Sequence, residues 1–174
     1  MANNMANFFF YCSKPTAEIK VVGVGGGGGN ALNHMFTQGI RDVDFVICNT
    51  DAQALEASPV PVKVQLGASL TGGRGAGNKP ETGRQAAIEN IEDVKQTLAH
   101  NTKMVFITAG MGGGTGTGSA PEVARLAKET GSVVIGVATM PFEAEKARID
   151  KAEFGLQELR EVTDTCIVLD NNRL

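Results

Sequence analysis

Short apolar runs alternate along the chain with longer segments in which apolar residues recur at helical spacing. The continuous apolar runs lie at Ile19–Val24, Val43–Cys48, Met104–Thr108, Val133–Thr139 and Thr165–Leu169. Continuous runs of this kind are typical of strands that are buried on both faces, as in a parallel sheet. A further run, Val60–Leu66, contains a proline, which predicts an edge strand at best.

Helices are expected between these runs, at Asn30–Gln38, from Pro80 to about Ala99, at Pro121–Glu129, and from about Ala147 to Glu161. Pro80 and Glu81 suit a helix start, because proline lacks the N–H that is unpaired there and the helix dipole favours an acidic side chain. Strands alternating with helices predict an α/β fold of Rossmann-like type. We expect three layers, with a mostly parallel sheet that carries helices on both faces.

The first residues show neither a helical nor a strand period, so we expect a loose N-terminal tail at 1–18 and one domain at 19–174. The apolar run Phe8–Cys12 is too short for a signal-peptide core or a membrane span, and no membrane insertion is expected. For Phe8–Tyr11 three interpretations stay open: a leftover tag, a packed terminal strand and a partner-binding motif.

Composition narrows the class of protein. The 174 residues are 42% apolar and carry a formal net charge of −3, so we expect no basic surface for binding nucleic acid. The three cysteines, Cys12, Cys48 and Cys166, are odd in number and far apart, so we expect reduced thiols in a cytoplasmic protein. The two histidines are isolated, so no zinc site is expected.

Glycine is concentrated in three loops. Of the 22 glycines, six lie in Gly23–Gly29 (the first loop), four in Gly72–Gly77 (the second loop) and six in Gly110–Gly118 (the third loop). Flexible linkers are one interpretation of such clusters. We favour another, in which these positions need a positive φ or a close backbone approach, because each cluster lies between a strand-like and a helix-like segment.

The first and third loops follow strands and lead into helices, which is where open α/β sheets bind ligands. A helix N-terminus offers unpaired N–H groups and about half a positive charge, so the two loops together could hold a di- or triphosphate. No lysine or arginine lies within Gly23–Asn30 or Gly110–Gly118. We therefore expect Mg²⁺ to supply the missing positive charge.

Three nucleotide motifs compete for this interpretation. The P-loop motif is absent, because the chain has no Gly-Lys pair. The dinucleotide pattern GxGxxG matches at Gly23–Gly28, with Asp51 at a suitable distance, and would indicate an oxidoreductase domain. That hypothesis leaves the sequence GGGTGTG at Gly112–Gly118 unexplained, because a pyrophosphate seated on the first loop needs no second cradle.

The motifs together resemble the tubulin/FtsZ superfamily of GTPases, and within it the bacterial cell-division proteins of the FtsZ type. The resemblance rests on GVGGGGGNA (Gly23–Ala31), NTDAQAL (Asn49–Leu55), GAG (Gly75–Gly77), PETGR (Pro80–Arg84) and GGGTGTG (Gly112–Gly118). It extends from about Ile19 to Leu174. It implies a GTPase that polymerises into filaments of the division ring, with the cytoplasm at midcell as its location.

The resemblance implies a site for GTP or GDP. Its phosphate-binding positions correspond to Gly26, Gly27, Gly28, Gly29 and Asn30 in the first loop and to Gly114, Thr115, Gly116, Thr117 and Gly118 in the third. Asn49 and Asp51 would lie near phosphate, sugar or metal, or would serve as strand-end caps. Ala76 and Gly77 would approach the γ-phosphate. Glu145 would contact the ribose, Arg148 the base and α-phosphate, and Asn171 the guanine.

Several positions depart from the family pattern. Glu145 and Arg148 are one residue closer together than is usual, which makes Glu143 a rival for the ribose contact. Arg74 stands where an apolar residue is common, and we expect it to point to solvent. Asp170 replaces the proline that usually precedes the guanine-binding asparagine.

Family members continue into a central helix, a loop of water-activating acids and a second domain, which are not within these 174 residues. We therefore expect no catalytic residue here, weak guanine-nucleotide binding with little turnover, and an exposed apolar patch on the sheet. The implied partners are further copies, full-length family subunits and division-ring proteins. An alternative hypothesis is a regulatory module that caps filaments.

Overall fold

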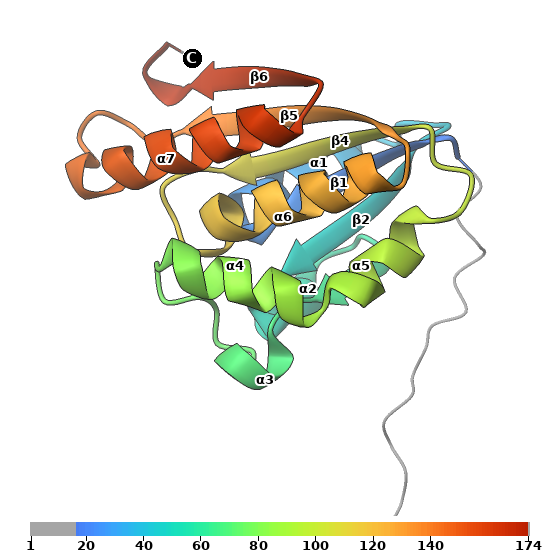
Figure 1. Ribbon diagram of the computed structural model, residues 1–174, viewed down its shortest axis with the longest axis horizontal. Helices are drawn as coiled ribbons and strands as arrows, with labels where there is room; N and C mark the ends of the chain where they lie inside the picture. Colours follow the sequence, from blue (N-terminus) through green and yellow to red (C-terminus); the bar gives the residue numbers. More distant parts are fainter. Residues whose placement is uncertain (1–16, 174) are drawn as a thin grey trace, which may run out of the picture.

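The computed structural model describes residues 17–173, in which six strands form one sheet (Figure 1). The strands are β1 (Ile19–Val24), β2 (Asp44–Asn49), β3 (Val62–Gln65), β4 (Met104–Gly110), β5 (Val133–Met140) and β6 (Thr165–Asp170). Their order is β3-β2-β1-β4-β5-β6, and every neighbouring pair is parallel. The predicted α/β architecture is confirmed, with a sheet that is parallel throughout and β3 at its edge.

Helices cover both faces of the sheet. They are α1 (Gly25–Thr37), α2 (Ala52–Ala57), α3 (Ala68–Thr71), α4 (Pro80–Glu89), α5 (Ile91–Leu98), α6 (Thr115–Glu129) and α7 (Lys146–Val162), and a 3-10 turn, η1 (Asn171–Arg173), follows β6. In Figure 1, α4 to α7 lie in front of the sheet and α1 and α2 behind it. The front core contains Val22, Ile107 and Leu159, and the rear core contains Leu32 and Ile47.

Two helices start earlier than the sequence predicts. Helix α1 begins at Gly25 rather than Asn30, and α6 begins at Thr115 rather than Pro121, so both first turns lie inside glycine loops. Pro121 is thus an interior residue of α6 and not its start. Proline at that position removes a helix hydrogen bond, and the extensive packing of α6 against the neighbouring α4 offsets the loss.

The single helix expected from Pro80 to about Ala99 is instead two helices, α4 and α5, which meet at Asn90. The side-chain oxygen of Asn90 accepts a hydrogen bond from the Gly67 N–H at 2.8 Å, and its amide nitrogen donates to Asp93 at 2.9 Å. Asparagine side chains that bond nearby backbone compete with helical hydrogen bonds. The break is therefore a tertiary effect. Helices α2 and α3 were not predicted, because they are too short to show a period.

One sheet face, on the side of α1, carries exposed apolar side chains on β5 and β6. Val133, Ile167 and Leu169 are 47%, 46% and 37% exposed. Val137 pairs in register with Ile167 and is only half-buried. Within residues 17–173, helix α1 packs against β1, β2 and β4 and leaves this corner open. The exposed apolar surface expected from the resemblance lies here.

The N-terminal end of the described chain is tied to the sheet before β1 begins. The Ala17 N–H donates to the Asp44 carboxylate at 3.2 Å, and the Glu18 carbonyl accepts from the N–H groups of Lys103 and Met104. The expectations for Met1–Thr16, including Phe8–Tyr11, fall outside the described residues. In the described range no helix combines the length and apolar character needed to cross a membrane.

Candidate functional site

A cavity of about 380 Å³ opens at the carboxyl ends of β1, β4 and β5. Glycine-rich backbone forms most of its wall, and polar side chains from α7 and η1 stand at its margin. The lining residues are Gly26, Gly27, Gly110, Met111, Gly113, Gly114, Thr115, Gly116, Thr139, Met140, Pro141, Glu145, Arg148 and Asn171. The first and third loops therefore converge on one space, as the sequence predicts.

The two loops touch through their backbones. A Cβ built on Gly27 would lie 3.0 Å from the Gly110 Cα, and one built on Gly25 would lie 2.7 Å from the Gly116 nitrogen. Gly25 also has a φ of +71°, which side chains disfavour. Glycine at these positions lets the first turns of α1 and α6 approach each other to backbone contact.

Both helix N-termini at the cavity lack a side-chain cap. Neither Val24, which precedes α1, nor Gly114, which precedes α6, caps its helix with a side chain. The first N–H groups of a helix have no partner within the helix, and together they carry about half a positive charge. Two such ends at one cavity are the arrangement that suits an anion with several charged oxygens.

The second loop packs against the third from the side. A Cβ built on Gly114 would lie 2.9 Å from the Ala76 Cβ and 2.8 Å from the Lys79 nitrogen. Ala76 is buried, at 6% exposure, and Gly77 is exposed with a φ of +58°. Neither residue lines the cavity itself. The second loop thus borders the outer end of the third loop.

An ion pair stands at the margin of the cavity where α7 begins. Arg148 Nη1 donates to Glu145 Oε2 at 2.7 Å, and Glu145 Oε1 accepts from the Phe142 N–H at 3.2 Å. Glu143, the alternative to Glu145 for the ribose contact, is exposed and does not line the cavity. The arrangement offers a guanidinium with further donors beside the glycine backbone.

Asn171 also lines the cavity, from the turn η1 after β6, and the neighbouring Asn172 accepts a hydrogen bond from the Glu143 N–H at 3.0 Å. The turn is held by the carboxylate of Asp170, which accepts from the backbone N–H of Asn172 at 3.0 Å and from its side-chain amide at 2.8 Å. The backbone hydrogen bond holds the pKa of Asp170 below its ordinary value. Asp170, a departure from the family pattern, therefore positions the turn that carries Asn171.

Other predicted site residues lie in packing contacts or caps. Gly28, Gly29, Thr117 and Gly118 are buried, Asn30 is exposed, and none of them lines the cavity. The Thr117 hydroxyl accepts from the Gly112 N–H at 2.9 Å and so shapes the third loop from within. Their contacts with a nucleotide stay predictions.

Asn49 and Asp51 also lie outside the cavity lining. The Asp51 carboxylate caps α2 by accepting from the N–H groups of Gln53 and Ala54, at 3.0 and 3.1 Å. The Asn49 side chain is buried and accepts from the Asp51 N–H at 3.3 Å. Local capping, the alternative left open by the sequence, describes what both side chains do here, and a nucleotide contact stays a prediction.

Three further lining residues, Gly110, Met111 and Gly113, belong to the third loop that the sequence selects, whereas Thr139, Met140 and Pro141 were not selected as site residues. Thr139 and Met140 end β5, which lies beside β4 in register. The signal that points to them is their place at the carboxyl end of a parallel strand, because such ends meet at one edge of the sheet.

Comparison with known proteins matches residues 18–174 to the family model described as Tubulin/FtsZ family, GTPase domain. The chain belongs to the Tubulin/FtsZ family. The cell division protein FtsZ of Porphyromonas gingivalis is 46% identical over 176 residues, which covers 100% of this chain and 38% of that protein. Across three FtsZ relatives, the chain spans between 26% and 43% of the relative's length.

Solved structures of the Tubulin/FtsZ family share the fold. An empty FtsZ dimer of M. jannaschii has a TM-score of 0.87 at 42% identity, and the match covers 92% of this chain and 47% of that one. CetZ2 from Haloferax volcanii, solved as a GTPγS-bound protofilament, has a TM-score of 0.80 at 28% identity, covering 89% of this chain and 49% of that one. The chain therefore corresponds to part of these proteins.

Proposed function

We propose that this chain is the nucleotide-binding part of an FtsZ-type cell-division GTPase and that it binds GTP or GDP in the cavity between the first and third loops. One observation carries the proposal: the uncapped N-termini of α1 and α6 meet at that cavity. Backbone N–H groups that point at one space suit a polyphosphate. The GTPγS-bound state of the CetZ2 relative is consistent with this ligand class.

The residues divide by the part of the nucleotide that they would contact. Gly26, Gly27, Gly114, Thr115 and Gly116 offer backbone or hydroxyl donors to the phosphates from the cavity wall. Arg148 would contact the α-phosphate and base, Glu145 the ribose, and Asn171 the guanine. Ala76 and Gly77 would meet the γ-phosphate beyond Gly114.

We propose Mg²⁺ as the companion of the bound nucleotide. Mg²⁺ requires octahedral oxygen ligands and usually keeps several waters while it binds phosphate oxygens. Thr115, which lines the cavity and whose hydroxyl shares a hydrogen bond with that of Thr50, would offer an oxygen ligand of this kind. The ion would neutralise phosphate charge that the glycine backbone does not balance.

Turnover by the 174-residue chain should be low. Among the described residues that line the cavity, Glu145 alone carries a carboxylate, and this carboxylate forms an ion pair with Arg148. A carboxylate held in an ion pair is poorly placed to orient an attacking water, which phosphoryl transfer requires. Hydrolysis in the whole protein would then need acidic groups from elsewhere, such as a neighbouring subunit in a filament at the cytoplasmic division site.

Calorimetric titration with GTP, ATP and NAD, with and without Mg²⁺, tests the proposal. We expect GTP to bind more tightly than ATP, Mg²⁺ to strengthen both, and NAD not to bind. The variant Arg148→Met should weaken GTP binding. Arg125→Met is the matched control, because Arg125 likewise pairs with a glutamate three residues earlier but lies outside the cavity lining. NAD binding tighter than GTP binding would instead support the oxidoreductase hypothesis.

A filament-capping role is the second candidate function. The exposed apolar side chains on β6 offer a surface to another subunit, and the CetZ2 relative forms a protofilament. If the chain caps filaments, a sub-stoichiometric amount should lower the light scattering of a polymerising full-length FtsZ. An unchanged trace would exclude this role.

A further inference from the structure

The segment Ala76–Lys79 joins the second loop to α4 and adopts an unusual backbone conformation. Gly77 and Asn78 have φ values of +58° and +59°, and a positive φ at a residue other than glycine is uncommon. Lys79 donates its N–H to the Ala76 carbonyl at 3.1 Å, which closes the turn. The turn packs on the third loop through Ala76 and Lys79. Its position is therefore linked to the wall of the cavity.

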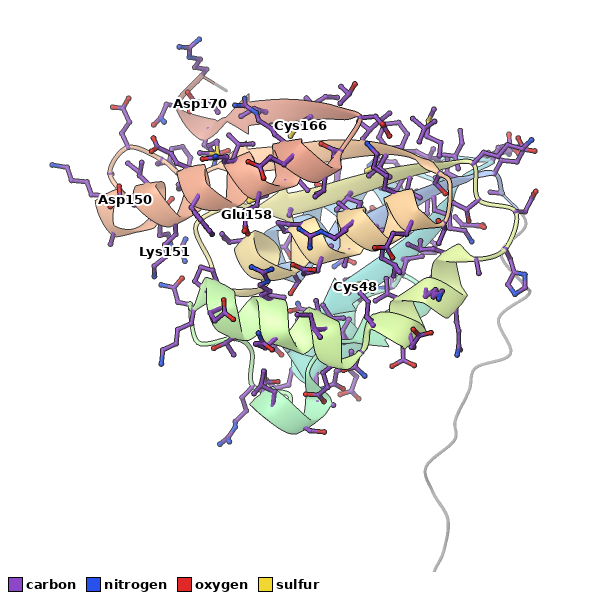
Figure 2. All side chains as sticks on the ribbon, in the orientation of Figure 1. Cys48, Asp150, Lys151, Glu158, Cys166 and Asp170 are labelled. Carbon is purple, nitrogen blue, oxygen red and sulfur yellow. The ribbon has the colours of Figure 1, made fainter. Side chains whose placement is uncertain are left out.

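A side chain from α7 reaches this turn. Lys151 Nζ donates a hydrogen bond to the Asn78 carbonyl oxygen at 3.1 Å, across 73 residues of sequence. Lys151 is half-buried, and in Figure 2 it lies on the side of α7 that faces α4. An ammonium group has three donors, and this bond uses one of them. The positive charge therefore stands beside the turn with donors to spare.

Helix α7 is thereby connected to both ends of the nucleotide site. Arg148, three residues before Lys151, lines the cavity, while Lys151 holds the turn that borders Gly114. The first part of the second loop is tied elsewhere, because the Gly75 N–H donates to the Thr50 carbonyl at 3.3 Å. Lys151 thus restrains the part of the loop next to α4.

We propose that Lys151 is a positioning residue that holds the Ala76–Lys79 turn in place for the terminal phosphate of a nucleoside triphosphate, so that preference for triphosphate over diphosphate depends on it. The inference rests on the proposed function. A diphosphate seated on the first turns of α1 and α6 does not need this turn. A triphosphate extends toward it and gains from both the fixed backbone and the nearby ammonium charge.

The test measures the affinity of the 174-residue chain for a non-hydrolysable GTP analogue and for GDP, both with Mg²⁺, by calorimetry. The variant Lys151→Met keeps the length and helix propensity of the side chain and removes its charge. We expect it to weaken analogue binding roughly three- to tenfold and to leave GDP binding within about twofold. Lys151→Arg should keep the wild-type ratio. Lys95→Met, on exposed α5, removes the same charge far from the turn and is the matched control.

The outcomes separate this inference from the proposed function. An unchanged ratio of analogue affinity to GDP affinity in Lys151→Met overturns the role of Lys151. This holds whether neither affinity changes or both fall equally, and an equal fall would indicate a purely structural tie. A wild-type chain that binds neither nucleotide overturns the proposed function and this inference with it. Thermal unfolding followed by circular dichroism confirms that each variant is folded.

Discussion

The hydroxyl groups of Thr50 and Thr115 lie 2.6 Å apart and share a hydrogen bond that connects the end of β2 to the first residue of α6. The Thr50 carbonyl also accepts from the N–H of Gly75 in the second loop. One buried threonine therefore links two of the three glycine loops. The shape of the cavity wall depends on this junction as well as on the glycines.

Removing either hydroxyl should destabilise the fold modestly. We expect Thr50→Val and Thr115→Val each to lower the free energy of unfolding by about 0.5–1.5 kcal/mol, the usual net value of a hydrogen bond. Urea unfolding measures both. The double variant should lose less than the sum of the single losses, because the two groups share one bond. Additive losses would mean that the hydroxyls do not interact.

Gly118 should tolerate no side chain. A Cβ built there would lie 1.9 Å from the Pro80 carbonyl oxygen, so Gly118→Ala must push α6 and α4 apart. We expect a loss of about 1–3 kcal/mol in unfolding free energy, as for other overpacked sites. Gly113→Ala is the control in the same loop, because its Cβ would meet nothing within 4 Å. Equal stability of the two variants in urea would contradict the packing argument.

Asp51 should contribute to stability as a helix cap. Asp51→Ala removes the acceptor for the N–H groups of Gln53 and Ala54, and the expected cost is about 1 kcal/mol. Asp51→Asn keeps a capping oxygen and should unfold at nearly the wild-type urea concentration. If the asparagine variant is as unstable as the alanine variant, the negative charge and not the cap is responsible.

Asp164 should make the stability of the chain sensitive to acid. Its carboxylate accepts from the Val134 N–H and from Lys128 Nζ, both at 2.9 Å, and these bonds hold its pKa below the ordinary value. A carboxyl with a lowered folded-state pKa stabilises the fold above its unfolded pKa of about 4. That contribution is lost as the pH falls through the folded pKa.

The urea midpoint of the wild type should therefore fall more steeply below about pH 4 than that of Asp164→Asn. The control is Asp150→Asn, which removes one carboxylate from an exposed position on α7 (Figure 2). It should keep the wild-type acid dependence. Parallel curves for the wild type and Asp164→Asn would argue against the contribution of Asp164.

The site was predictable where it depends on backbone. Glycines such as Gly27 and Gly116 stand at the ends of apolar runs, and parallel strands bring those ends to one edge of the sheet, so their convergence follows from the sequence pattern. The roles of individual side chains could be predicted less well from the sequence. Asp51 is a good acceptor in any setting, and only the position of α2 shows that it caps a helix. Lys151 carries no motif at all, because its partner is a backbone carbonyl 73 residues away.

The sequence by itself determined the parallel α/β fold, the edge position of β3 and the place of the glycine loops. Continuous apolar runs indicate strands buried on both faces, and glycines indicate positions that need conformational freedom. The tertiary structure decided where helices begin and break. Helix α6 starts at Thr115 and not at Pro121 because it packs on α4, and the helix after Pro80 divides at Asn90 because that side chain bonds Gly67. Such contacts join residues far apart in sequence, and no local pattern records them.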